Sequence, residues 1–184
     1  MSDTHAKIDD RLRGFIEAQP MFFVATAPLA DDGRINVSPK GLAGTFAVLG
    51  EHEVAYLDTN GSGAETIAHL RENGRITLMF NAFDSKPNIL RLYGRGEAIF
   101  TGDQRFDEYR SKFADAPDMA WRSIIRIDVE RVATSCGYGV PLMTFERHRD
   151  QLVAWTNKQS DAKLAAYQAK KNRNSIDGLP AVEA

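Results

Sequence analysis

The chain has 184 residues, of which 43% are hydrophobic and 26% are charged, and its formal net charge at pH 7 is -2. This length and composition are typical of one soluble globular domain. The near balance of charge gives no indication of nucleic acid or an anionic membrane as a partner. The single cysteine, Cys136, excludes an internal disulfide and favours a reducing compartment.

No apolar run approaches the roughly 20 residues that cross a bilayer. The polar segment 1–10 lacks the basic and apolar regions of a signal peptide. We therefore expect a cytoplasmic protein with a single domain over residues 1–184, a barrel core at about 20–135 and a C-terminal extension at 136–184.

The first part of the chain predicts a helix followed by short strands. Apolar residues at helical spacing predict an amphipathic helix over about 6–18 that ends before Pro20. Apolar alternation then predicts strands, and Asp31-Asp32-Gly33 predicts a turn between the first two of them. These strands are expected at 21–27, 34–38, 45–49 and 54–58.

The second part predicts further strands with helices between them. A helix is expected over 64–72, ended by Asn73-Gly74, and a short helix is expected after Asp103. The remaining expected elements are strands at 75–83, 89–100 and 124–133 and a helix at 162–171. About seven strands with short connections predict a mainly β fold with peripheral helices, in which an antiparallel sheet closes into a small barrel.

A polar motif, NVSPKG, occupies residues 36–41. Proline cannot donate to a sheet ladder, so we expect strand pairing to end at Pro39. Lys40 would then lie in a loop at a strand end, where an ammonium group can bind a phosphate. A solvated turn lysine is the alternative interpretation.

A second motif, NGSGAET, occupies residues 60–66 ahead of the predicted helix. Ser62 and Glu65 fit a capping box, in which both side chains satisfy amides at the helix start. Alternatively, free amides at the helix start, together with Ser62 and Thr66, cradle a phosphate. The two interpretations are partly compatible.

Two further side chains are candidates for a ligand site. Arg91 lies on the long predicted strand, where it either faces a groove or is exposed and paired with Glu97 or Asp84. Trp155 is interpreted first as an interface anchor and second as a residue that packs near an aromatic ligand.

Other familiar sites have no support in the sequence. The histidines are too scattered for a metal site, and His69 is expected on a solvated helix face. They are His5, His52, His69 and His148. Neither a nucleotide-triphosphate loop nor a serine-hydrolase elbow occurs, and Cys136 has no identifiable base.

Three segments in order resemble the pyridoxamine-phosphate-oxidase-like family of FMN-binding split barrels. They are RINVSPKG at 34–41, YLDTNGSG at 56–63 and ILRLYG at 89–94. The resemblance covers about residues 21–100 and implies a split barrel that holds FMN in a groove at a dimer interface. Gly63 and Ala64 depart from the family pattern, because the oxidases carry basic residues after the serine that matches Ser62.

The resemblance implies a set of cofactor-binding residues. Ser62 matches the phosphate-binding serine, Lys40 is the charged contact, and Trp155 takes the place of a partner-chain tryptophan. The full expected set is Val37, Ser38, Lys40, Ser62, Thr66, Arg91 and Trp155. The tail lacks a match to the substrate arginine of the oxidases, so oxidation of vitamin B6 is not the expected activity.

The resulting hypothesis is an FMN-dependent oxidoreductase that acts on a small molecule as a homodimer, without nucleic acid, membrane or metal. The flavin would carry the redox chemistry, which explains why no acid–base pair stands out and why no catalytic residue is named. One alternative is a non-catalytic flavin-binding or flavin-storage protein. Another keeps the fold but uses a deazaflavin or heme, and heme is disfavoured because no histidine has an obvious axial-ligand position.

Overall fold

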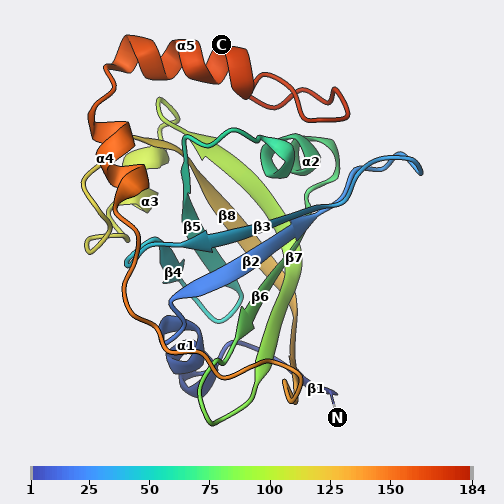
Figure 1. Ribbon diagram of the computed structural model, residues 1–184. Helices are drawn as coiled ribbons and strands as arrows, with labels where there is room; N and C mark the ends of the chain where they lie inside the picture. Colours follow the sequence, from blue (N-terminus) through green and yellow to red (C-terminus); the bar gives the residue numbers. More distant parts are fainter. Residues whose placement is uncertain (1, 183–184) are drawn as a thin grey trace.

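The computed structural model describes residues 2–182 and shows a strongly curved antiparallel sheet with helices around it (Figure 1). The strands are β1 (Ser2–His5), β2 (Met21–Thr26), β3 (Asn36–Gly41), β4 (Phe46–Val48), β5 (Glu53–Thr59), β6 (Arg75–Asn81), β7 (Ile89–Phe100) and β8 (Trp121–Ser135). The helices are α1 (Asp10–Glu17), α2 (Glu65–Asn73), α3 (Phe106–Arg110), α4 (Gln151–Asn157) and α5 (Asp161–Lys171). No helix among these described residues has the length and apolarity that a membrane crossing needs.

The strands form one 8-stranded sheet in the order β3-β2-β6-β7-β8-β5-β4, and β1 adds to β8. The strand pairs are antiparallel throughout. Within the described chain, the path ends at β3 and β4 without a ladder between them, so the barrel is split rather than closed. The predicted fold class, mainly β with peripheral helices in an antiparallel split barrel, is confirmed.

An aromatic cluster fills the inside of the curved sheet. The ring of Phe22 lies 4.9 Å from Phe46, 5.5 Å from Tyr56 and 5.4 Å from Phe80, in offset and edge-on arrangements that aromatic pairs favour. Helix α1 closes one end of this core with buried apolar side chains on one face. Its start is fixed by Asp9, whose carboxylate accepts a hydrogen bond from the Leu12 amide at 2.8 Å.

The predicted strands and helices are present with small shifts of their ends, and two elements were not predicted. Strand β1 has the polar sequence SDTH, so it carries no apolar alternation, and it is held by pairing with β8. Helix α4 follows a segment without regular structure, and it packs Leu152 and Val153 against a second apolar cluster.

The prediction that strand pairing ends at Pro39 is wrong. Strand β3 continues to Gly41, with Pro39 opposite Phe23 and Lys40 opposite Phe22. Because β3 is an edge strand, a proline can point its nitrogen away from the sheet without losing a ladder hydrogen bond. Lys40 is therefore held on a strand and does not lie in a loop.

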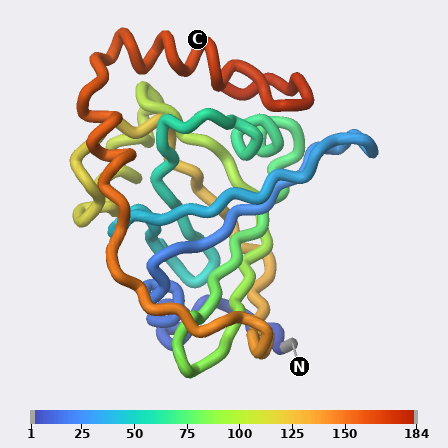
Figure 2. The backbone as a smooth tube through the Cα atoms, viewed as in Figure 1, coloured from blue at the N-terminus to red at the C-terminus, as the bar shows by residue number. Residues whose placement is uncertain are grey.

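The C-terminal extension wraps around the barrel. Figures 1 and 2 show the segment after β8 passing in front of α1 to α4, after which α5 crosses the top of the molecule near α2. The last described residues fold back, and Ala181 and Val182 join the main apolar core. The C-terminal extension therefore lies against α2 and the loop that precedes it.

Candidate functional site

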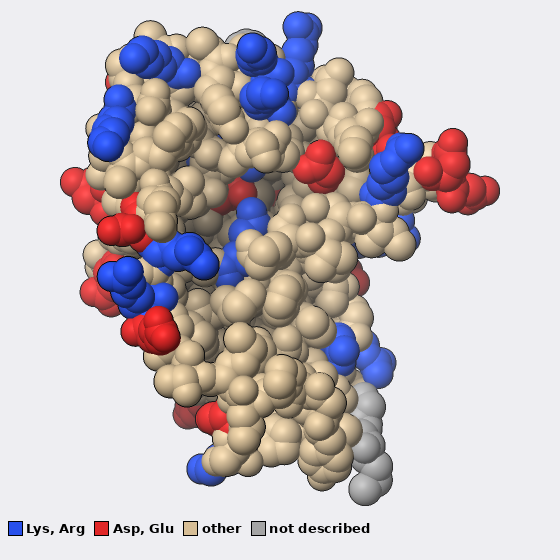
Figure 3. Space-filling view, viewed as in Figure 1, with Lys and Arg blue, Asp and Glu red and all other residues tan. Residues whose placement is uncertain are grey.

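A polar cavity of about 230 Å³ lies where β3, the end of β5 and the start of α2 meet. Its lining residues are Asn36, Ser38, Pro39, Lys40, Asp58, Thr59, Gly61, Gly63, Ala64, Glu65, Thr66 and Arg122. Figure 3 shows this face of the molecule hollowed near its middle, with basic and acidic side chains visible inside. We call this space the polar cavity.

Strand β3 supplies one wall of the polar cavity through its period-two alternation. Asn36, Ser38 and Lys40 share the half-buried face, whereas Val37 is on the opposite face and is 62% exposed. Alternate residues of a strand point to opposite sides, so Val37 and Ser38 cannot both line the same space with their side chains.

A buried ion cluster forms the floor of the polar cavity. Asp58, on β5, accepts hydrogen bonds from Lys40 Nζ at 3.2 Å, Arg122 Nε at 2.8 Å and Ser123 Oγ at 3.2 Å. Asp58 and Arg122 are only 2% and 5% exposed. Burial by itself would raise the pKa of the Asp58 carboxyl, but the charges of Lys40 and Arg122 outweigh it and lower the pKa. Asp58 is therefore ionised at neutral pH, and the three charges sum to +1.

The start of α2 faces the polar cavity without a side-chain cap. The N-cap position is occupied by Ala64, and no side-chain hydrogen bond satisfies the amides of the first turn. Because α2 begins at Glu65, Ser62 lies two residues before the cap and is exposed, and Glu65 accepts a hydrogen bond from the Ile176 amide at 3.3 Å. The predicted capping box of Ser62 and Glu65 is therefore wrong, and the first-turn amides remain available to an anion.

Asn36 connects the polar cavity to the interior. Its Nδ2 donates to Thr66 Oγ1 at 3.1 Å and to Thr26 Oγ1 at 3.2 Å, and its Oδ1 accepts from Ser38 Oγ at 3.0 Å. Thr26 Oγ1 lies 2.9 Å from His69 Nδ1. His69 is 0% exposed, so the prediction of a solvated helix face is wrong: this face of α2 packs against the sheet.

Three of the predicted site residues meet at the polar cavity: Ser38, Lys40 and Thr66. Ser62 belongs to the adjoining loop but is not among the lining residues, and Val37 lies on the outer face of β3. The solvated turn lysine is excluded for Lys40, because its side chain is 23% exposed and paired with Asp58.

Arg91 and Trp155 lie elsewhere. Arg91 is half-buried on β7 and donates from Nη1 to Ser135 Oγ at 3.2 Å. Among the described residues it forms no ion pair with Glu97 or Asp84, its two expected carboxylate partners. Trp155 lies on α4, is 36% exposed and packs edge-on against Tyr167 with ring centroids 5.3 Å apart.

Sequence reasoning did not select Asp58 and Arg122 for the site. The available signal is their position at the ends of apolar runs, VAYLD at 54–58 and RSIIRI at 122–127. A charged side chain in a buried strand requires a partner of opposite charge, so the presence of Asp58 in one such strand and Arg122 in another indicates that the two pair. Within residues 2–182, no cluster of three or more His, Cys, Asp or Glu side chains could hold a metal ion.

The sequence matches known proteins along most of its length. Residues 8–136 match the family described as pyridoxamine 5'-phosphate oxidase. The family protein ustO of Aspergillus flavus is 41% identical over 191 residues, which cover 96% of this chain and 76% of ustO.

The fold is similar to that of HupZ from Group A Streptococcus. One crystal structure of HupZ has a TM-score of 0.56 and 22% identity and covers 70% of this chain and 99% of that chain. A second has a TM-score of 0.53 and 23% identity, with coverages of 68% and 91%. This likeness agrees with the split-barrel architecture described above.

Proposed function

Because the chain belongs to the pyridoxamine 5'-phosphate oxidase family, we propose that it is an FMN-dependent oxidoreductase that works as a homodimer. The phosphate of FMN binds in the polar cavity, at the start of α2. The observation that carries this proposal is the uncapped first turn of α2, which opens onto the same cavity as Lys40 and Arg122.

The chemistry of the polar cavity suits a phosphate. Amides at a helix start point at an anion and carry the positive end of the helix dipole. Lys40 and Arg122 add charge-assisted donors, while Asp58 holds both cations in place. The Thr66 hydroxyl lines the same space, and the carboxylate of Glu65 acts against an anion there.

The size of the polar cavity indicates which part of the ligand it takes. Ligand pockets usually measure about 300–1,000 Å³, and this one measures about 230 Å³. It suits a phosphate and the neighbouring part of a ribityl chain, so the isoalloxazine ring extends outside, along β3. We propose that Ser38 lies near that ring. Val37 points to the opposite, outer face of the strand and does not contact the ring in the same chain.

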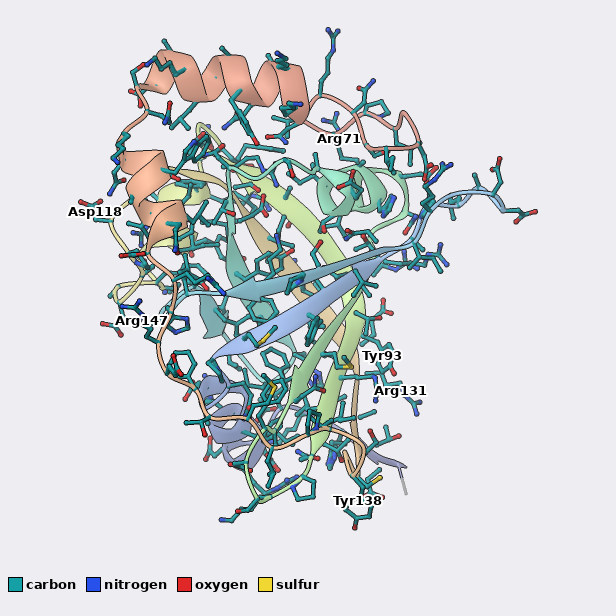
Figure 4. The ribbon with its side chains drawn as sticks, viewed as in Figure 1. Arg71, Tyr93, Asp118, Arg131, Tyr138 and Arg147 are labelled. Atoms are coloured by element: carbon teal, nitrogen blue, oxygen red, sulfur yellow. The ribbon has the colours of Figure 1, made fainter. Side chains whose placement is uncertain are left out.

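The outer face of the sheet supports the homodimer. Ile35, Val37 and Tyr93 are exposed large apolar side chains on neighbouring parts of this face. Figure 4 shows Tyr93 on β7 and Arg131 on β8, which are register partners, pointing away from the barrel. A second copy that covers this face removes its apolar surface from water.

The flavin supplies the hydride or electron chemistry when it is bound. The residues of this chain bind and orient it: Lys40, Arg122 and Thr66 at the phosphate, and Asp58 behind the two cations. The proposed substrate is a small molecule that reaches the ring from the open side of the barrel. Neither Arg91 nor Trp155 lines the polar cavity of its own chain. We therefore propose that they contact the cofactor bound by the other copy in the dimer.

The absorbance spectrum of the purified protein, with and without added FMN, tests this proposal. We expect flavin bands and binding that Lys40→Met weakens about tenfold to a hundredfold, as loss of a charge-assisted hydrogen bond does. Lys86→Met removes an exposed lysine in the loop after β6 and should leave binding unchanged. Absence of FMN binding by the wild type would refute the cofactor. Binding without turnover with nicotinamide nucleotides or common electron acceptors would favour a flavin-storage protein.

A further inference from the structure

The C-terminal extension holds the loop that precedes α2. From α5, Gln168 Nε2 donates to Asn60 Oδ1 at 2.6 Å. One turn later, Asn172 Nδ2 donates to the carbonyl of Gly61 at 2.9 Å. Asn60 and Asn172 are 2% and 0% exposed, so these hydrogen bonds are shielded from competing water.

The last described residues, 177–182, are themselves held by hydrogen bonds on both sides of α2. Arg71 Nη1 donates to the carbonyl of Ala181 at 2.7 Å, and Figure 4 shows Arg71 directed from α2 toward the C-terminal segment. The Val182 amide donates to the carbonyl of Asn172 at 3.0 Å. On the other side, the Arg34 amide donates to the Asp177 carboxylate at 2.7 Å, which joins the tail to the segment before β3.

The tail also contacts Glu65, one of the two acidic residues that line the polar cavity. The Ile176 amide donates to Glu65 Oε1 at 3.3 Å, so a tail amide binds the carboxylate that opposes an anion. The loop that the tail contacts contains Gly61 and Gly63, and a glycine-containing loop has more conformational freedom to lose when a ligand orders it. Contacts that fix such a loop before binding reduce this entropic cost.

We propose that Gln168 and Asn172 are positioning residues of the phosphate site: they hold residues 60–63 so that the first-turn amides of α2 face the polar cavity. This inference rests on the proposed function. It assigns to α5 and the tail a role in cofactor affinity, although they contribute no lining residue to the polar cavity.

Titration of the full chain with FMN and with riboflavin tests the inference, because riboflavin lacks the phosphate. The variant Gln168→Met keeps the length of a half-buried side chain and removes its donor. We expect FMN to bind about threefold to tenfold more weakly, as loss of one net hydrogen bond implies, while the affinity for riboflavin stays the same. Asn172→Ala should shift the ratio of the two affinities in the same direction.

Gln159→Met is the matched control, because Gln159 Nε2 donates within its own segment to the Trp155 carbonyl at 3.1 Å. It should leave both affinities unchanged. An unchanged ratio in a folded Gln168→Met variant, with a wild type that prefers FMN, would overturn the positioning role alone. A wild type that binds FMN and riboflavin equally would instead overturn the phosphate site, and the inference with it.

Discussion

Asp58 determines whether two cations can remain buried beside the polar cavity. Replacement by asparagine keeps the shape but leaves Arg122 and Lys40 without their common carboxylate. Loss of one partner of a buried ion pair costs about 3–5 kcal/mol, so we expect Asp58→Asn to lower the free energy of unfolding by that amount. Urea denaturation followed by circular dichroism measures this change.

The control for Asp58 is Asp128→Asn. Asp128 also accepts hydrogen bonds from an arginine, Arg126, but its side chain is 60% exposed. A solvent-exposed pair contributes about 0–1 kcal/mol, so this variant should remain close to the wild type. Equal losses in the two variants would show that burial of the ion cluster has no special role.

His69 makes the stability depend on pH. Burial lowers its pKa below the ordinary value of 6.5, against the opposing charges of Glu65, Glu72 and Asp177. Below about pH 6.5, His69 becomes protonated in the unfolded chain, whereas in the folded chain it stays neutral until the pH falls to its lower folded-state pKa. The free energy of unfolding therefore decreases as the pH drops from about 6.5 to the folded-state pKa. At neutral pH and above, this loss is absent.

The variant His69→Asn tests that pH dependence, because asparagine can still hydrogen-bond to Thr26 but does not titrate. We expect a lower overall stability, from the smaller side chain, and a shallower fall in the melting temperature between about pH 7 and about pH 5. The effect of Asp58, whose pKa is lowered, lies at more acidic pH and is common to both proteins. Parallel melting curves for the two proteins would contradict the role of His69.

At the scale of the elements, we expect the same substitution to have opposite effects at two glycines, one just past the end of a helix and one inside a helix. Gly74 ends α2 with φ of 72°, in the left-handed region that disfavours a side chain. Gly14 lies inside α1, and a methyl group there has nothing within 4 Å. We expect Gly74→Ala to destabilise the protein by about 1 kcal/mol and Gly14→Ala to stabilise it by about 0.5–1 kcal/mol. Chemical denaturation measures both, and the same sign for both would contradict the assigned backbone conformations.

The strands with apolar alternation could be predicted from the sequence, because apolar residues recur at every second position and every second residue of such a strand is buried. Strand β1 could not, because its four residues are polar and only the edge of β8 makes them a strand. Pro39 misled the prediction for β3, since whether a proline ends a strand depends on its neighbours in space. The capping box failed for a similar reason, because Glu65 binds a tail amide more than one hundred positions away, at Ile176.

The residues of the candidate site could likewise be predicted only in part from the sequence. Lys40 and Thr66 could be selected from their local motifs, and Ser38 from the family resemblance, although Lys40 lies on a strand and not in the predicted loop. Asp58 and Arg122 are separated by 64 positions, and their pairing follows from the order of the sheet rather than from any local pattern. The contacts of α5 with the loop before α2 depend in turn on how the extension crosses the barrel.

At the scale of the whole molecule, the outer face of the sheet is the expected dimer interface. Val37 is 62% exposed on this face, so Val37→Asp should leave the fold intact while placing a charge in the interface. We expect light scattering to give a dimer for the wild type and a monomer for Val37→Asp, with weaker FMN binding by the monomer. Leu142→Asp changes a residue that is 75% exposed on the segment after β8 and should remain a dimer. A dimeric Val37→Asp protein would place the interface elsewhere.

The central claim is that the polar cavity at the start of α2 binds the phosphate of FMN. A crystal structure of the wild-type chain with FMN tests it most directly. The account predicts phosphate density at the first-turn amides of α2, beside Lys40 and Thr66, with the ring system along β3 near Ser38. FMN bound with its phosphate at any other place, or a polar cavity still free of phosphate at saturating FMN, would contradict the account.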